Sequence, residues 1–190
     1  MLDLGDAYVL AKPAGWVVDA RPPGATPVAR KERSLVAFLQ LACGKWAPIL
    51  RDDLHRHGLL HRLDANSSGL VLGALTFSRY YMLHMLLDSQ LIDREYVVLL
   101  HGWVSPNVVL VNARVRRGLL PGSASSLAVD GKPAMTRLKV LAHLRCGVPV
   151  GSGNALTLAA VRIITGRTHQ IRAHMAYIGH PVVCDAKYTS

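Results

Sequence analysis

The chain has 190 residues, of which 51% are apolar, and its formal net charge is +10 at pH 7. This length suits one domain with a real core, and no run reaches the roughly 18 consecutive apolar residues of a membrane-spanning helix, so we expect no membrane partner. The basic charge favours a polyanionic partner, with nucleic acid first; the alternatives are a solvated basic surface or a protein that sits inside a ribonucleoprotein.

The first half of the chain predicts one short strand, two helices and one buried strand. Residues 6–12 form an apolar strand that Pro13 and Gly15 turn, and residues 19–33 form a basic loop rich in proline and glycine. Ser34 caps a helix to about residue 42, and Thr76 caps a second helix to about residue 91. Between these helices, residues 70–75 are a continuous apolar strand.

The second half predicts four strands and a final helix. The strands are residues 94–100, 108–114, 135–142 and 155–165, and a glycine-rich turn at residues 151–154 precedes the last of them. Thr168 is expected to cap a helix over residues 169–178, which Gly179 and Pro181 then end. The whole pattern predicts an α+β fold with a mixed, mainly antiparallel sheet flanked by helices.

Cysteine and histidine usage argues against disulfides and metals. Cys43, Cys146 and Cys184 are odd in number and widely spaced, which indicates neither a disulfide framework nor a zinc ribbon. The nine histidines lack a recognisable ligand spacing, so no metal site is expected. A reducing intracellular compartment fits, either the cytoplasm or an organelle.

Two polar clusters lie beside the most apolar segments. The sequence His-Arg-Leu-Asp at residues 61–64 precedes one buried strand, and residues 167–172 follow another. A carboxylate such as Asp64 at a sheet edge needs a cation nearby to stay ionised. Arg172 is one candidate, although helix spacing alone fits equally well with an arginine on a solvated surface.

Four segments, in this order along nearly the whole chain, resemble the RluA family of RNA pseudouridine synthases. They are Lys-Pro-Ala-Gly at residues 12–15, residues 61–69, Arg-Glu-Tyr at residues 94–96 with Gly102, and residues 166–181 with Asp185 and Tyr188. The second and fourth segments are the specific ones. The Gly-Lys-Pro-Ala segment at residues 131–134 also resembles a family segment that leads into a strand.

The resemblance implies a single catalytic domain over residues 1–190, with a central active-site cleft and no cofactor. Its implied activity is the isomerisation of specific uridines in ribosomal or transfer RNA to pseudouridine. Asp64 would be the catalytic carboxylate, and Arg62 would enter the space left by the flipped uridine. Tyr96 would pack against the uracil, Ile171 would line the pocket, and Arg172 would pair with the carboxylate. His61 and His169 would be structural hydrogen-bonding groups.

Three departures from the family pattern stand out. Asn66-Ser67-Ser68 replaces a segment with threonine before serine, which keeps a hydroxyl group. Cys184 stands where a glycine usually precedes the aspartate, and it would strain a turn that requires positive φ. The sequence also ends soon after Tyr188, where the family usually continues through further strands, so we expect a C-terminally shortened domain, and no S4-like domain is expected.

This shortening leaves a second function open. The domain could be a catalytically inactive RNA-binding or structural subunit of a ribonucleoprotein assembly such as a ribosome. An unrelated hydrolase built on Asp64 and His61 would lack a nucleophile elbow and a paired carboxylate. The target RNA, the modified nucleotide and the chemical role of Asp64 are not specified by these patterns.

Overall fold

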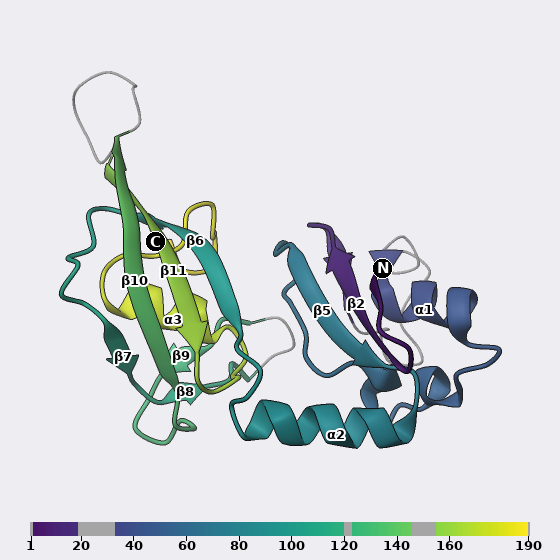
Figure 1. Cartoon of the computed structure of the whole chain (residues 1–190). Coiled ribbons are helices and arrows are strands. Elements are labelled where there is room, and N and C mark those ends of the chain that lie inside the picture. The colour runs from purple at the N-terminus through teal and green to yellow at the C-terminus, as the bar shows by residue number, and fades with distance from the viewer. Residues whose placement is uncertain (1, 19–32, 120–122, 146–154, 190) are drawn as a thin grey trace. The chain divides into compact units, whose positions relative to one another are not determined.

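The computed structural model describes residues 2–18, 33–119, 123–145 and 155–189 (Figure 1). The chain divides into two compact units, Met1–Ile92 and Asp93–Ser190, and each has its own sheet and helices. The predicted turn at residues 151–154, Cys146 and residues 19–32 of the predicted loop lie outside the described residues. A single catalytic domain over residues 1–190 remains a prediction.

The first unit is built on a three-stranded antiparallel sheet in the order β1-β2-β5. Its strands are β1 (Leu2–Asp3), β2 (Ala7–Lys12) and β5 (Gly69–Ala74). In this register Tyr8 pairs with Gly73, and a Cβ on Gly73 would meet the Tyr8 ring carbon Cζ at 2.1 Å. A glycine at position 73 is therefore what allows the fully buried Tyr8 ring to lie on β5.

Two helices accompany this sheet, and both begin where the sequence predicts. Helix α1 (Leu35–Cys43) starts after Ser34, whose hydroxyl accepts the Ala37 amide, and α2 (Phe77–Asp88) starts after Thr76, whose hydroxyl accepts the Arg79 amide. Helix α2 lies below the C-terminal end of β5 in Figure 1. The short elements are the parallel pair β3 (Trp16–Val17) and β4 (Arg33–Ser34) and the 3-10 turns η2 (Pro48–Arg51) and η3 (Arg56–Gly58).

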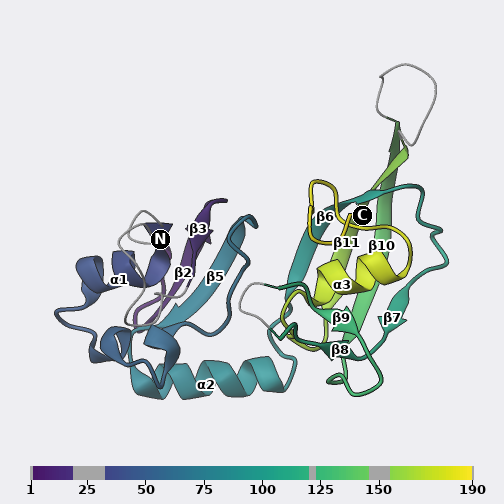
Figure 2. The same cartoon turned by 180° about the vertical axis from the view of Figure 1, so that it is seen from behind.

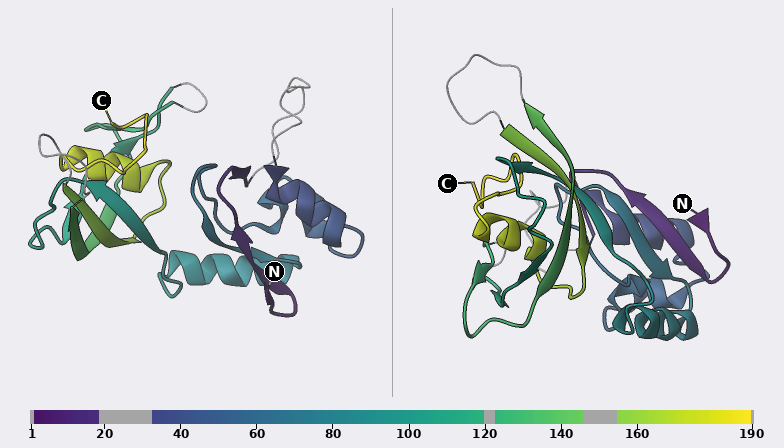
Figure 3. Two further views of the ribbon diagram at one scale, coloured as in Figure 1. Left: turned by 90° about the horizontal axis from the view of Figure 1, so that it is seen from above. Right: turned by 60° about the vertical axis from the view of Figure 1, so that its left-hand side comes forward.

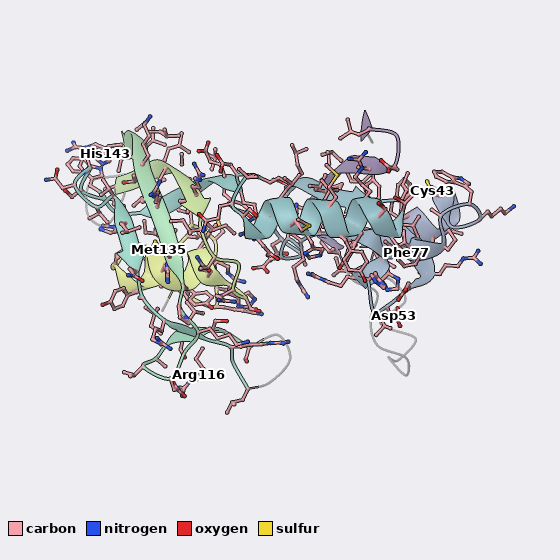
Figure 4. The ribbon with its side chains drawn as sticks, turned by 60° about the horizontal axis from the view of Figure 1, so that its bottom comes forward. Cys43, Asp53, Phe77, Arg116, Met135 and His143 are labelled. Atoms are coloured by element: carbon pink, nitrogen blue, oxygen red, sulfur yellow. The ribbon has the colours of Figure 1, made fainter. Side chains whose placement is uncertain are left out.

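The second unit contains a four-stranded antiparallel sheet in the order β6-β11-β10-β7. These strands are β6 (Glu95–His101), β7 (Leu110–Asn112), β10 (Met135–Arg145) and β11 (Ala155–Ile163). A register shift between Val140 and Ala142 marks a β-bulge in β10. Figure 4 labels Met135 at the start of this long strand and His143 near its far end.

The strand predicted over residues 108–114 is shorter than expected. It ends at Asn112, and a separate small pair follows, β8 (Val115–Arg116) with β9 (Ser126–Leu127). The pairing continues in the same register beyond this end, since the Val115 amide and carbonyl both hydrogen-bond with Lys132. Figure 4 labels Arg116 in this small pair.

Helix α3 (Gln170–Tyr177) covers one face of the four-stranded sheet, as Figure 2 shows from behind. The buried core between them contains Leu100, Val104, Val111, Leu138, Ala159, Val161 and Met175. Thr168 does not cap this helix. The N-cap is His169, whose φ of 53° is left-handed and whose side chain makes no capping hydrogen bond. The Gln170 side chain accepts the amide of Arg167, which precedes the helix.

The strand pairings confirm the expected α+β class. All pairings between the described strands are antiparallel except β3–β4. The views in Figure 3 show the same layering within the second unit, where α3 packs on one side of the sheet. Among the described residues, no helix has the length and apolar character needed to cross a membrane.

Candidate active site

The segment that carries Asp64 runs along β5 before the chain enters that strand. Leu59 bridges to Gly73, the Leu60 amide donates to the Leu72 carbonyl at 3.0 Å, and the Leu72 amide donates to His61 Nε2 at 3.2 Å. His61 therefore accepts a backbone hydrogen bond through this nitrogen, which fits the structural role expected for it. Residues 59–61 thus extend the sheet beside β5. Their hydrogen bonds to β5 fix the backbone position from which residues 62–64 continue.

The side chains of this segment alternate between core and solvent. Leu63 is buried, Arg62 is exposed and Asp64 is half-buried. Because Leu63 anchors the segment in the core, its neighbours on both sides are held at the surface. An exposed arginine directly before a half-buried carboxylate is compatible with the roles that the sequence predicts for Arg62 and Asp64.

Lys12, at the end of β2, is a buried lysine that ties two segments together. Its Nζ donates to the carbonyls of Pro13 at 3.0 Å, Trp16 at 2.7 Å and Ala65 at 3.1 Å. The Gly15 amide donates to the same Ala65 carbonyl at 2.8 Å. The turn after β2 is therefore fastened to the residue that follows Asp64.

The charges near Lys12 act in opposite directions. Burial lowers the pKa of the Lys12 ammonium, and the negative charge of Asp64 acts to raise it. With three carbonyl acceptors and a carboxylate nearby, a charged Lys12 is compensated despite being only 2% exposed. The cation expected near Asp64 is thus present within the first unit, and sequence reasoning did not assign it to Lys12.

In the second unit, α3 is fixed to the sheet by a chain of buried polar side chains. Gln170 Nε2 donates to the Met135 carbonyl and to Thr136 Oγ1, each at 3.0 Å. His174 Nδ1 lies 2.8 Å from Thr136 Oγ1, and its Nε2 lies 2.9 Å from the Ala113 carbonyl. Burial lowers the pKa of His174, so the neutral ring accepts from Thr136 and donates to Ala113.

Arg172 on α3 forms a bidentate ion pair with Asp185. The Arg172 Nε donates to Asp185 Oδ2 at 2.6 Å, and the terminal nitrogen Nη2 of Arg172 donates to Asp185 Oδ1 at 2.7 Å. Burial opposes ionisation of Asp185, but the hydrogen bonds and charge of Arg172, with the Lys187 amide and the His169 charge, lower its pKa. The Arg172 guanidinium also lies over the Tyr188 ring, 4.9 Å from its centroid.

Tyr188 closes this cluster, which we name the Arg172 cluster and define as Arg172, Asp185, Tyr188 and His169. The Tyr188 hydroxyl accepts the Ser125 amide at 2.7 Å and donates to the Ser125 carbonyl at 2.9 Å. The same hydroxyl lies 3.3 Å from His169 Nδ1. Burial raises the pKa of Tyr188, so its hydroxyl stays a neutral donor. The residues after α3 are thereby fixed beside Arg172.

Tyr96 and Ile171 lie on the α3 side of the second unit. Tyr96 on β6 pairs with Val161 of β11, whose buried side chain belongs to the core under α3. Ile171 is half-buried and packs against this same core. Tyr96 is half-buried as well, so part of its surface is open to a ligand.

The candidate residues therefore fall into two groups. Arg62 and Asp64 lie in the first unit with Lys12, whereas Tyr96, Ile171 and Arg172 lie in the second. The pairing of Arg172 with Asp64 remains a prediction. The sequence analysis did not predict the Arg172–Asp185 pair. Asp185 and Tyr188 stand in the last family segment, thirteen and sixteen residues after Arg172, and their place in that segment could have indicated a contact with Arg172.

The described residues offer no group of three or more histidine, cysteine, aspartate or glutamate side chains that could hold a metal ion. The expectation of a reaction without a metal or cofactor remains a prediction.

A model of the family described as RNA pseudouridylate synthase matches residues 6–177 of the chain. The chain belongs to this family. The match spans the four segments that resemble the RluA family up to residue 177, and confirms that resemblance.

Curated relatives agree with the family match. The chain is 32% identical over 183 residues to an uncharacterized RNA pseudouridine synthase, YlyB, of Bacillus subtilis, covering 96% of this chain and 55% of that protein. It is 31% identical over 183 residues to a ribosomal large subunit pseudouridine synthase D of Vibrio vulnificus, covering 96% and 50%. This family member thus spans about half the length of these two relatives.

Two solved structures share the fold. Human RNA pseudouridylate synthase domain containing 1 has a TM-score of 0.63 and 23% identity, over 96% of this chain and 66% of that one. Human RNA pseudouridylate synthase domain containing 4 has a TM-score of 0.64 and 20% identity, over 100% of this chain and 68% of that one. These likenesses confirm the expected pseudouridine synthase fold.

Proposed function

We propose that this protein isomerises specific uridines in RNA to pseudouridine, with Asp64 as the catalytic carboxylate. The observation that carries the proposal is the placement of Asp64 within a family match over residues 6–177. Its segment is hydrogen-bonded along β5, and a buried lysine fastens the residue that follows it. A half-buried carboxylate on so firmly held a backbone is pre-organised to meet a substrate.

The reaction requires no outside reagent. The bond between N1 of uracil and C1′ of ribose breaks, the base turns, and C5 bonds to C1′. The proton on C5 leaves and N1 takes up a proton, so the composition of the RNA is unchanged. One ionised carboxylate can serve this chemistry either by bonding at the sugar or by removing a proton.

The other residues have roles in binding the substrate. Arg62, exposed beside Asp64, enters the space vacated by the flipped uridine. Tyr96 stacks on the target uracil, an interaction of about 1–3 kcal/mol for an exposed base. Ile171 lines the pocket in which that base is held. Arg172 pairs with Asp64 and holds it ionised and oriented, and Asp185 keeps the guanidinium in position.

The substrate class is ribosomal or transfer RNA. The relatives named ribosomal large subunit pseudouridine synthase D support ribosomal RNA as the first choice. The net charge of +10 supports a phosphate-rich ligand.

The decisive experiment compares wild type with Asp64→Asn on fractionated ribosomal and transfer RNA. Carbodiimide mapping should locate new pseudouridines with wild type and none with Asp64→Asn, while the affinity for RNA stays within a few-fold. The matched control is Asp130→Asn, which alters a surface carboxylate of 67% side-chain exposure that pairs with Arg116. The amount of pseudouridine formed by Asp130→Asn should equal that formed by wild type.

The same experiment tests the second function. An inactive RNA-binding subunit would bind RNA but give no product with wild type, and that result would refute the enzyme proposal. Arg172→Ala is the companion variant: a rate equal to that of wild type in a folded protein would remove Arg172 from the catalytic arrangement.

A further inference from the structure

Trp103 is an exposed aromatic residue just beyond the end of β6. It is 49% exposed, and its ring stacks with His143 at a centroid distance of 6.0 Å and an interplanar angle of 29°. The Arg145 guanidinium carbon lies 4.9 Å from the centroid of the same ring. An aromatic ring that is half open to solvent thus has a histidine and a cation as its immediate neighbours.

His143 and Arg145 approach the indole from the sheet. They lie two residues apart on β10, after the bulge, and their partners on β11 are Thr157 and Ala155. Residues two apart on a strand point to the same face. Both side chains therefore reach Trp103 from the same face of the sheet, and about half of the Trp103 side chain stays open to solvent.

The backbone that carries Trp103 is held on both sides. The buried Thr157 hydroxyl donates to the Gly102 carbonyl at 2.8 Å and accepts the Val104 amide at 3.0 Å. His143 Nε2 donates to the Val104 carbonyl at 2.9 Å. A ring held on such a backbone loses little conformational entropy when a ligand stacks on it.

Trp103 and its neighbours His143 and Arg145 lie on the same face of the sheet as Tyr96. Tyr96 and Leu100 are four residues apart on β6, and Leu100 pairs with Thr157, which pairs with His143. Trp103 follows Tyr96 by seven residues, so their Cα atoms are at most about 25 Å apart, which is the length of about seven stacked nucleotides at 3.4 Å each. A single RNA strand is long enough to reach from one aromatic residue to the other.

We propose that Trp103, supported by His143 and Arg145, is a stacking platform for an unpaired base of the RNA substrate, away from the uridine that is modified. This inference rests on the proposed function in taking RNA as the ligand. Indole is a strong stacking surface, and a guanidinium beside it adds a charge that attracts the RNA backbone. The net charge of +10 favours RNA over a protein surface as the occupant.

The test compares Trp103→Leu with wild type for binding of a short labelled single-stranded RNA and of the corresponding duplex. Leucine keeps an apolar side chain against His143 but removes the stacking ring. We expect about tenfold weaker binding of the single strand, equivalent to about 1.4 kcal/mol, and little change for the duplex, whose bases are already stacked. Trp103→Phe should restore most of the affinity.

Two further variants make the result specific. Trp46→Leu is the matched control, since it removes a tryptophan that is 62% exposed in the first unit, and its affinity for RNA should equal that of wild type. Arg145→Gln changes an exposed side chain and should lower the dependence of affinity on salt by about 0.7 in log–log slope. Urea unfolding midpoints equal to that of wild type show that each variant is folded.

The outcomes separate this inference from the proposed function. If folded Trp103→Leu binds single-stranded RNA as tightly as wild type does, the platform is refuted, and a role in covering the sheet end or in binding a protein replaces it. If wild type makes no pseudouridine while Trp103→Leu still weakens RNA binding, the platform stands and the enzyme proposal fails. Where product forms, Trp103→Leu should raise KM and leave kcat unchanged.

Discussion

Lys12 in the first unit and Arg172 in the second are both cations at the predicted site, but they are compensated in different ways. The Lys12 ammonium is surrounded by three backbone carbonyls, and the Arg172 guanidinium is held by the Asp185 carboxylate. Lys12 therefore fixes the backbone near Asp64, whereas Arg172 depends on a second charged side chain.

The largest expected effect comes from removing Arg172. Arg172→Ala leaves Asp185, whose side chain is only 7% exposed, without its bidentate partner, and an uncompensated buried carboxylate costs about 3 kcal/mol of unfolding free energy. Urea unfolding at pH 7 measures this loss. Arg117→Ala, on an exposed residue of the same unit, is the control and should change stability by less than about 0.5 kcal/mol. Equal stability of the two variants would contradict the importance of the pair.

Lys12→Met should have a somewhat smaller effect on stability. Methionine fills the space but leaves the carbonyls of Pro13, Trp16 and Ala65 without their donor, at a cost of about 2 kcal/mol. The initial rate of pseudouridine formation should also fall, even under conditions in which the variant is fully folded, since Asp64 loses its fixed position. The measurement pairs urea unfolding with initial rates, and Lys45→Met on an exposed residue is the control. A rate that stays at the wild-type value would remove Lys12 from the positioning of Asp64.

Acid should destabilise the protein by about 1 kcal/mol, partly through one buried and one half-buried histidine. Burial lowers the pKa of His174 and of His84, so the unfolded chain binds more protons than the folded one once the pH falls below about 6.5. Stability from the neutral rings is complete above that pH and is lost as the pH falls toward their folded-state pKa values. His174 is fully buried, so His174→Gln should flatten the decline between pH 7.5 and 5 more than His84→Gln does. Urea midpoints across this range provide the comparison, and equal slopes would contradict it.

The smallest effect is a gain in stability. Cys184 has a φ of 61°, the positive value that the family's glycine at this position suggested. Cys184→Gly should raise the unfolding free energy by about 0.5–1 kcal/mol, because glycine adopts this conformation without strain. Gln90→Gly makes the same change in the first unit, where φ is 58°, and should give a similar gain. A loss of stability in Cys184→Gly would mean that the thiol makes a contact worth more than the strain.

Local rules predicted most of the elements and missed the features that depend on distant contacts. Hydrophobic periodicity located β2, β5, β6, β10 and β11, and the hydroxyls of Ser34 and Thr76 located two helix starts. The start of α3 was misplaced because no side chain caps this helix: His169 is its N-cap with a left-handed φ, and the Gln170 side chain is bonded to β10. Patterns within a short window carry no information about such a contact.

The site residues show the same limit. The family resemblance selected Asp64 and Arg172, but sequence reasoning gave Lys12, which is 2% exposed, no role beyond its place in the first family segment. The Asp185 carboxylate that holds Arg172 was also missed, because helix spacing suggested only which residues share a face with Arg172. Both omissions concern the compensation of charge, which is decided by tertiary structure and not by neighbouring sequence.

The bonds between Tyr188 and Ser125 join residues 63 positions apart, and this has a consequence for synthesis. The strands β2 and β5 pair within the first 92 residues, so the first unit can fold while the rest of the chain is still being made. The Arg172 cluster cannot close until Asp185 and Tyr188 have left the ribosome. During translation, the part of the site that holds Asp64 is therefore completed well before the part that holds Arg172.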